Sequence, residues 1–198
     1  MATEDRDKLL KLLATHAYDF KRGGYTLVSG RISDEYLDCK MALSHAEAAP
    51  ALGRLLLFHL DPRAVAIGGL TMGADPIAYN TVHASAGGRD LRWFSVRKEP
   101  KKHGRRKLIE GDVPPGASIA IVDDVVTSGG STIEAIQKAR AEGLNVIQVL
   151  VLVDREEQGG LEKVKAEAGV DVQVVAMFKK SEIRAEWDTQ RQTSRKTA

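Results

Sequence analysis

One stretch of the chain places carboxylates, hydroxyls and glycines at a spacing that could bind a sugar phosphate. The apolar run of residues 119–122 ends in Asp123 and Asp124, the small-residue segment 127–132 follows, and a helical pattern begins at Ile133. Apolar runs are typical of buried parallel strands, and open α/β sheets bind ligands where such strands end. Small residues ahead of a helix let backbone N–H groups approach a phosphate. The acid pair suits ribose hydroxyls or a cation.

Other common phosphate motifs are missing from the chain. No Gly-Lys-Ser/Thr closes a P-loop, and no G-x-G-x-x-G opens a dinucleotide-binding fold. The alternative for the acid pair is an ordinary strand-to-helix turn whose carboxylates are solvated.

Strand, acid pair, threonine, Gly-Gly and helix occur in the order that resembles the signature of type I phosphoribosyltransferases. The resemblance implies that the two acids meet the ribose hydroxyls of phosphoribosyl diphosphate (PRPP) and act in catalysis, while the turn wraps the 5-phosphate. The implied PRPP-binding residues of this stretch are Asp123, Asp124, Val125, Val126, Thr127, Ser128, Gly129, Gly130 and Ser131.

A basic segment over residues 97–107 follows an expected strand. It holds seven of the 29 Lys and Arg residues but only one of the 27 Asp and Glu residues, so the rest of the chain carries a net charge of −4. One basic patch on a mildly acidic body indicates a local anionic ligand. No aromatic residue interleaves these charges for base stacking, so a nucleic-acid partner is not expected. The alternative is a solvated charged loop.

The order Arg-Lys-x-x-Lys-x-His-Gly in this segment resembles the catalytic loop of orotate phosphoribosyltransferases. The resemblance implies that Arg97, Lys98, Lys101 and His103 contact the diphosphate of PRPP, with Lys101 and His103 as catalytic residues. It also implies a homodimer in which this loop reaches the partner subunit's site.

Two further regions resemble the same family. The hairpin pattern of residues 25–38 around Ser29-Gly30 is similar to the hood that covers the base, although Val28 stands where some members have a lysine. The glycine-rich loop 68–76 is similar to one that contacts the diphosphate, although Met72 replaces a lysine found in some members.

An arginine, Arg155, follows the long apolar run 146–153. A guanidinium at the carboxyl end of a strand is well placed to fork onto a carboxylate. The resemblance implies that Arg155 grips the carboxylate of orotate and that Thr127 also contacts the base. A salt bridge between Arg155 and a surface acid is the alternative.

The spacing of apolar residues and glycines predicts an α/β fold in which a central, mostly parallel sheet is flanked by helices. The resemblance makes this the type I phosphoribosyltransferase fold with a small N-terminal hood. Expected helices cover residues 4–22, 45–60, 77–84, 133–141, 161–168 and 181–187, and expected strands cover 25–38 as a hairpin, 63–68, 91–96, 119–122, 146–153 and 172–178.

Length and composition suit one ordinary domain. The 198 residues are 43% hydrophobic and 28% charged, which predicts a single domain over residues 1–198, with the hood at about 20–40 and a polar, frayed tail at about 188–198. One cysteine, Cys39, precludes an intrachain disulfide and fits a reducing, cytoplasmic location. No apolar run reaches the roughly 20 residues of a membrane span, so no membrane partner is expected.

The resemblance as a whole implies transfer of the phosphoribosyl group from PRPP to orotate, giving orotidine 5′-monophosphate and diphosphate in pyrimidine (UMP) biosynthesis. Mg²⁺ is the implied cofactor, held mostly by substrate oxygens rather than by protein ligands. Two alternatives stay open: a phosphoribosyltransferase for another base, and a non-catalytic regulator of the same fold that binds PRPP or RNA.

Overall fold

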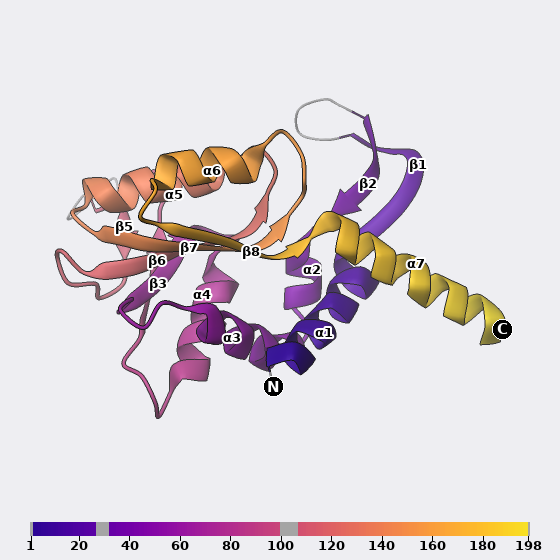
Figure 1. Ribbon diagram of the computed structural model, residues 1–198, viewed down its shortest axis with the longest axis horizontal. Coiled ribbons are helices and arrows are strands. Elements are labelled where there is room, and N and C mark those ends of the chain that lie inside the picture. Colours follow the sequence, from indigo (N-terminus) through magenta and orange to yellow (C-terminus); the bar gives the residue numbers. More distant parts are fainter. Residues whose placement is uncertain (1, 27–31, 100–106, 198) are drawn as a thin grey trace.

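A six-stranded sheet forms the centre of the molecule in a computed structural model that describes residues 2–26, 32–99 and 107–197 (Figure 1). The strand order is β5-β4-β3-β6-β7-β8, and every neighbouring pair is parallel except β4 and β5. The strands are β3 (Ala66–Leu70), β4 (Arg92–Val96), β5 (Ile109–Glu110), β6 (Ser118–Val126), β7 (Asn145–Asp154) and β8 (Gln173–Lys179).

Helices cover both faces of this sheet. The pair α5 (Gly130–Ala141) and α6 (Gly160–Ala168) lies on one face, and the other face is covered by α1 (Ala2–Leu12), α2 (Cys39–Leu43), α3 (Ala48–His59) and α4 (Asp75–Ser85) (Figure 1). This arrangement confirms the predicted mixed α/β fold with a central, mostly parallel sheet.

The central strand β6 shows why the apolar run of residues 119–122 is buried. Ile119 and Ile121 point into the core beneath α5 and α6, whereas Ala120 and Val122 point into the core beneath α1–α4. All four are fully buried, because neighbouring side chains of a strand face opposite sides and each side here is covered. The strand therefore leads without interruption into the acid pair.

The first helix is shorter than predicted. Helix α1 gives way to a π-helical turn, η1 (Leu13–Ala17), and the chain then enters β1 (Tyr18–Thr26), so the expectation of a helix through residue 22 is wrong. The reason is tertiary: β1 pairs antiparallel with β2 (Ile32–Leu37), and Tyr18 packs edge-on against Trp187. The two strands confirm the predicted hairpin, whose connecting turn lies outside the described residues.

The C-terminal segment also differs from the prediction. Helix α7 (Lys180–Thr197) runs well beyond the predicted helical turn over 181–187 and includes most of the polar region 188–198. Helix α7 runs beside η1 and the hood (Figure 1). Trp187 packs against Tyr18 and Phe20, and Gln190 bonds Thr15, so contacts with the N-terminal part of the chain hold a helix that is polar by composition.

Smaller differences concern element boundaries. The predicted helix over 45–60 corresponds to α3, which begins only at Ala48, and the short helix α2 that precedes it was not predicted. Helix α5 begins at Gly130 rather than Ile133, which brings the last residues of the small-residue segment into its first turn. Among the described residues, no helix has both the length and the apolar character needed to cross a membrane.

Candidate functional site

The carboxyl ends of the parallel strands bring the predicted site segments to one edge of the sheet. The turn after β6 lies beside the loop after β7, because Arg155 N donates to Val126 O at 2.9 Å. A methyl group at Gly160 would overlap the carbonyl of Thr127, so these two connections pack backbone against backbone. The close approach fixes the turn that is predicted to wrap a phosphate relative to Arg155.

The turn itself is open at the start of α5. Gly129 has φ 86°, a left-handed conformation that glycine adopts without strain, and no side chain caps the helix at this residue. Ser128, Gly130 and Ser131 are exposed. Uncapped N–H groups and the positive end of the helix dipole suit an anion here. Val126, by contrast, is buried and can offer a ligand only its backbone.

Asp123 is buried and held by hydroxyl groups. Its Oδ2 accepts hydrogen bonds from Ser131 Oγ at 2.7 Å and from Thr132 Oγ1 at 2.6 Å, and only 4% of the residue is exposed. Burial raises the pKa of Asp123 to about 6, although the two hydroxyl bonds act in the opposite direction. Asp123 thus fastens the first turn of α5 to the end of β6.

Asp124 is the more accessible member of the pair, with a side chain 14% exposed. Lys40 Nζ lies 3.4 Å from its Oδ2 and 2.7 Å from Asp38 Oδ1. The glycine-rich loop after β3 packs against the same carboxylate, because a methyl group at Gly73 would overlap Asp124 Oδ1. Asp124 is therefore positioned by elements that lie far apart in sequence.

Lys40 is a residue that the sequence analysis did not single out. Burial lowers its pKa, but the bonds to Asp38 and Asp124 outweigh this effect, so the pKa is raised and the side chain stays charged. The available signal was its place two residues after Asp38, at the end of the hood. Lys40 and Asp124 are 84 positions apart in the sequence, so no local pattern indicates that they form a pair.

Arg155 is buried, with only 9% of the residue exposed. Its Nε and NH2 atoms have no hydrogen-bond partner, and NH2 lies 3.4 Å from Glu157 Oε1. Buried donors without partners are costly in a folded protein, so these two suit a bound anion. The ion pair with Glu157 agrees with the salt-bridge alternative, but two donors are left over for a carboxylate.

Only the start of the basic segment lies within the described residues. Lys138 on α5 donates to the carbonyl of Arg97 at 3.0 Å and to that of Lys98 at 2.6 Å, which ties the segment to the site helix. The Arg97 side chain contacts Glu110 at 3.3 Å, and Lys98 is exposed. The predictions for Lys101 and His103 fall outside the described residues.

The two departures from the resembling pattern have different outcomes. Met72 is 67% exposed in the loop after β3 and supplies no charge there. Val28 lies outside the described residues. Met72 gives the glycine-rich loop no positive charge at this position. Lys40, on a different element, contributes a cation next to the acid pair.

A cation would find few protein ligands in the described part of the site, where no group of three or more His, Cys, Asp and Glu side chains is suited to holding a metal ion. Asp123 already accepts two hydroxyl bonds, which leaves Asp124 as the accessible carboxylate. This donor set fits Mg²⁺ bound through one carboxylate and substrate oxygens.

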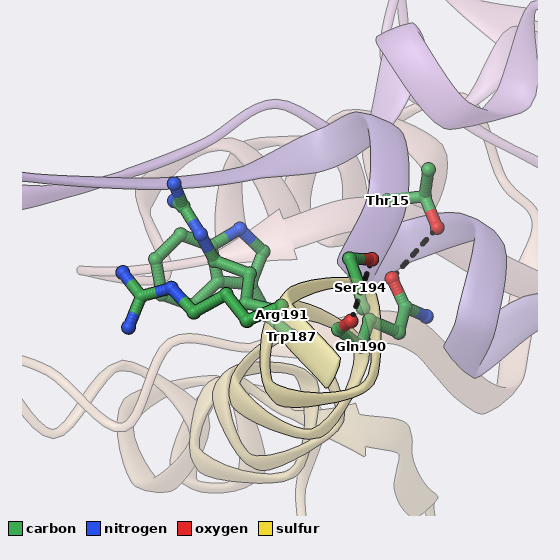
Figure 2. Close-up of a pocket in the computed structure, with 7 residues that line it drawn as sticks. Thr15, Trp187, Gln190, Arg191 and Ser194 are labelled. Carbon is green, nitrogen blue, oxygen red and sulfur yellow. Dashed lines mark hydrogen bonds between the residues drawn. The ribbon is translucent and has the colours of Figure 1, made fainter. Parts of the chain in front are cut away.

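A separate hollow of about 450 Å³ lies away from this sheet edge, between η1 and α7 (Figure 2). It is lined by Ala14, Thr15, Trp187, Gln190, Arg191, Ser194 and Arg195. Arg191 stacks over the Trp187 ring at 4.4 Å. None of the predicted site residues lines this hollow, so the candidate site stays at the acid pair.

Comparisons with known proteins point in one direction. No family model matches the chain. The orotate phosphoribosyltransferase of Rhodopirellula baltica is 41% identical over 162 residues, which cover 78% of this chain and 83% of that protein. The orotate phosphoribosyltransferase of Sorangium cellulosum is 42% identical over 173 residues, covering 85% and 88%.

Solved structures agree with the sequence relatives. A crystal structure of Mycobacterium tuberculosis orotate phosphoribosyltransferase in complex with Fe(III) dicitrate has a TM-score of 0.76 and 35% identity, covering 90% of this chain and 98% of that one. A structure of the same enzyme in complex with PRPP has a TM-score of 0.70 and 29% identity, covering 91% and 92%.

Proposed function

The chain belongs to the orotate phosphoribosyltransferase family, and we propose on that premise that it transfers the phosphoribosyl group of PRPP to orotate. The products are orotidine 5′-monophosphate and diphosphate, in the synthesis of UMP. The observation that carries the proposal is the shared sheet edge, where an acid pair, an uncapped helix start and an arginine with two unbonded donors lie together.

Each part of this edge suits one part of the substrates. The backbone of residues 125–131 would hold the 5-phosphate, and Asp124, supported by the buried Asp123, would meet the ribose hydroxyls. Arg155 would bind the carboxylate of orotate, with Thr127 beside the base. Electrostatic complementarity supports this orientation, because anions then face N–H groups and a guanidinium while hydroxyls face carboxylates.

The reaction breaks the bond between ribose C1 and diphosphate and forms a bond from C1 to a ring nitrogen of orotate. Positive charge develops on the ribose, so the nearby Asp124 carboxylate stabilises it, and cations must stabilise the departing diphosphate. Arg97, Lys98, Lys101 and His103 would do the latter. Because the chain forms no covalent bond to the substrate, positioning and electrostatics account for the rate.

Asp124 would be the protein ligand of Mg²⁺, and substrate oxygens would supply the remaining ligands. When bound, Mg²⁺ neutralises charge on the diphosphate. Lys40 Nζ lies 3.4 Å from the Asp124 carboxylate and helps to hold Asp124 in place.

The role of the basic segment in stabilising the leaving diphosphate is tested at Lys101. We expect Lys101→Ala to lower kcat by about 10²-fold or more while changing the KM for PRPP less, because a leaving-group contact strengthens in the transition state. Steady-state kinetics with both substrates would measure this. A weaker PRPP affinity with unchanged kcat contradicts a transition-state role for Lys101.

A homodimer that shares this segment predicts complementation between subunits. Mixing Lys101→Ala protein with Asp124→Asn protein should form heterodimers in which one site has both intact residues, and activity should recover to about a quarter of wild type if subunits mix at random. No recovery after confirmed subunit exchange would mean that each site is built from one chain.

The central assay follows the loss of orotate absorbance in the presence of PRPP and Mg²⁺, with each component omitted in turn. Consumption of orotate only when all three are present supports the proposal. A panel of purine and pyrimidine bases separates orotate specificity from transfer to another base. PRPP binding without turnover of any base would instead identify a non-catalytic regulator.

Residues 1–198 would act as one domain with the hood at about 20–40, and the protein would be cytoplasmic, without nucleic-acid or membrane partners. The single, buried Cys39 supports a reducing compartment. Cell fractionation with an antibody against the chain would test the location.

A further inference from the structure

A line of alternating charges connects Arg155 to the hood. Arg155 NH2 lies 3.4 Å from Glu157 Oε1, and the same oxygen accepts from Lys180 Nζ at 3.2 Å. Lys180 Nζ also donates to Glu35 Oε2 at 2.6 Å. None of these four side chains is more than 16% exposed, so solvent screens the contacts only weakly.

The line joins three elements that are distant in sequence. Arg155 and Glu157 belong to the loop after β7, Lys180 begins α7, and Glu35 is on the hood strand β2. A second bond strengthens the middle of the line, because Ser181 N at the start of α7 donates to Glu156 Oε2 at 2.9 Å. Helix α7 therefore holds the hood and the Arg155 loop at the same time.

Glu157 is shared between two cations, and the sharing favours Lys180. The Lys180 contact is a hydrogen bond, whereas the contact to Arg155 is an ion pair that leaves Arg155 Nε and NH2 without hydrogen bonds. A carboxylate that is free to turn prefers to form two parallel bonds with a guanidinium. Without Lys180, Glu157 would turn toward Arg155 and compete with a substrate carboxylate.

We propose that Lys180 is a positioning residue that keeps Arg155 open to the substrate carboxylate by holding Glu157, and that ties the hood to this open state by holding Glu35. The inference rests on the proposed function, since it takes Arg155 as the group that binds orotate.

The hood end of the line is firmly fixed. Glu35 Oε1 also accepts from Tyr18 OH at 2.6 Å and from Arg184 NH1 at 3.0 Å. Burial by itself raises the pKa of Glu35, but the bonds from Lys180, Tyr18 and Arg184 outweigh it and lower the pKa to about 2. Glu35 is thus ionised at neutral pH and helps to anchor Lys180 between two carboxylates.

Kinetics of Lys180→Met test the positioning role. The KM for orotate should rise about tenfold, while kcat and the KM for PRPP stay within about twofold, because only the binding of one substrate is weakened. Lys180→Arg should restore the orotate KM, since it keeps the charge. Lys179→Met removes an exposed neighbouring lysine and is the matched control. An unchanged orotate KM, or an equal rise for both substrates, overturns the proposal.

A double variant distinguishes competition by Glu157 from a non-specific disruption of the site by Lys180→Met. In the Lys180→Met background, Glu157→Gln should return the orotate KM to within about threefold of wild type, because the competing charge is gone. Glu157→Gln alone should lower the orotate KM, which keeps the test available if Lys180→Met does not fold. A further rise of the orotate KM in the double variant, or an unchanged orotate KM in Glu157→Gln alone, contradicts competition by Glu157.

Hydrogen exchange tests the link without relying on turnover. Glu35→Gln on the hood should speed amide exchange in residues 155–160, and Lys179→Met should not. If the wild-type protein fails to consume orotate but this link is present, only the proposed substrate is wrong. If orotate is consumed but exchange in this loop is unaltered, the link is wrong and the proposed function stands.

Discussion

Asp123 at the acid pair and Glu35 on the hood are both largely buried carboxylates, yet the protein moves their pKa values in opposite directions. Asp123 accepts bonds from two neutral hydroxyls, and burial raises its pKa to about 6. Glu35 is subject to the same effect of burial, but Lys180, Tyr18 and Arg184 outweigh it and lower its pKa to about 2. The bonds from the two cations and Tyr18 therefore reverse the direction in which burial alone would shift the pKa of Glu35.

This difference separates two kinds of polar site in one molecule. The Glu35 carboxylate on the hood is already neutralised by Lys180 and Arg184, so it contributes to holding these elements together. Among the residues that the structure describes, the acid pair has a smaller share of cations, with one Lys40 contact at 3.4 Å, and can still attract a ligand. Carboxylate charge that the protein does not fully neutralise is available to a ligand.

The largest expected effect concerns activity at the acid pair. Asp124→Asn should lower kcat/KM by about 10²–10³-fold, because it removes the carboxylate nearest to the developing positive charge. Glu35→Gln should cost far less activity, and Glu162→Gln, on the exposed face of α6, should cost none. Steady-state kinetics of the three variants measure the contrast. Similar losses in Asp124→Asn and Glu35→Gln would erase the distinction between the two sites.

Stability should depend on Glu35 at neutral pH. A folded-state pKa of about 2, below the ordinary value of 4.5, means that ionised Glu35 stabilises the fold above about pH 4.5 and that this contribution is lost as pH falls toward 2. Glu35→Gln should therefore reduce the free energy of unfolding by on the order of 2 kcal/mol at pH 7 and by about half as much at pH 3. Urea denaturation at both pH values measures this.

Asp123 should show the opposite pH dependence. Its folded-state pKa of about 6 lies above the ordinary 3.8, so its contribution is fully present below about pH 4 and is lost as pH rises through 6. Relative to Asp123→Asn, the wild-type protein should lose on the order of 2 kcal/mol of unfolding free energy between pH 4 and pH 7. A difference that does not vary with pH would show that the hydroxyl bonds fully offset the burial of this carboxylate.

The smallest expected effect tests how Asp124 is positioned. Gly73→Ala should push the Asp124 carboxylate aside and lower kcat/KM by about tenfold, because a shift of about 1 Å is costly in a preorganised site. Gly88→Ala is the matched control, since a methyl group there meets only Ser85 O at 3.8 Å. Equal activity of the two variants, with Gly73→Ala folded, would mean that Asp124 adjusts freely.

Much of the fold could be predicted because its signals are local. The strands β6 and β7 are apolar runs that a doubly covered sheet requires, and glycines mark the turns that follow them. Elements whose stability comes from distant partners were predicted poorly. Residues 18–20 form a strand through pairing with β2, and α7 packs Trp187 against Tyr18.

The sequence by itself determined the local order of the candidate site: an acid pair at the end of a buried strand, a small-residue turn before a helix, and an arginine after the next strand. Only the tertiary structure decided how these groups are supported. It placed Lys40 on Asp124 and joined Arg155 to Glu35 through Glu157 and Lys180. Periodicity reports which face of an element is buried, whereas an ion pair depends on which two surfaces the complete fold brings together.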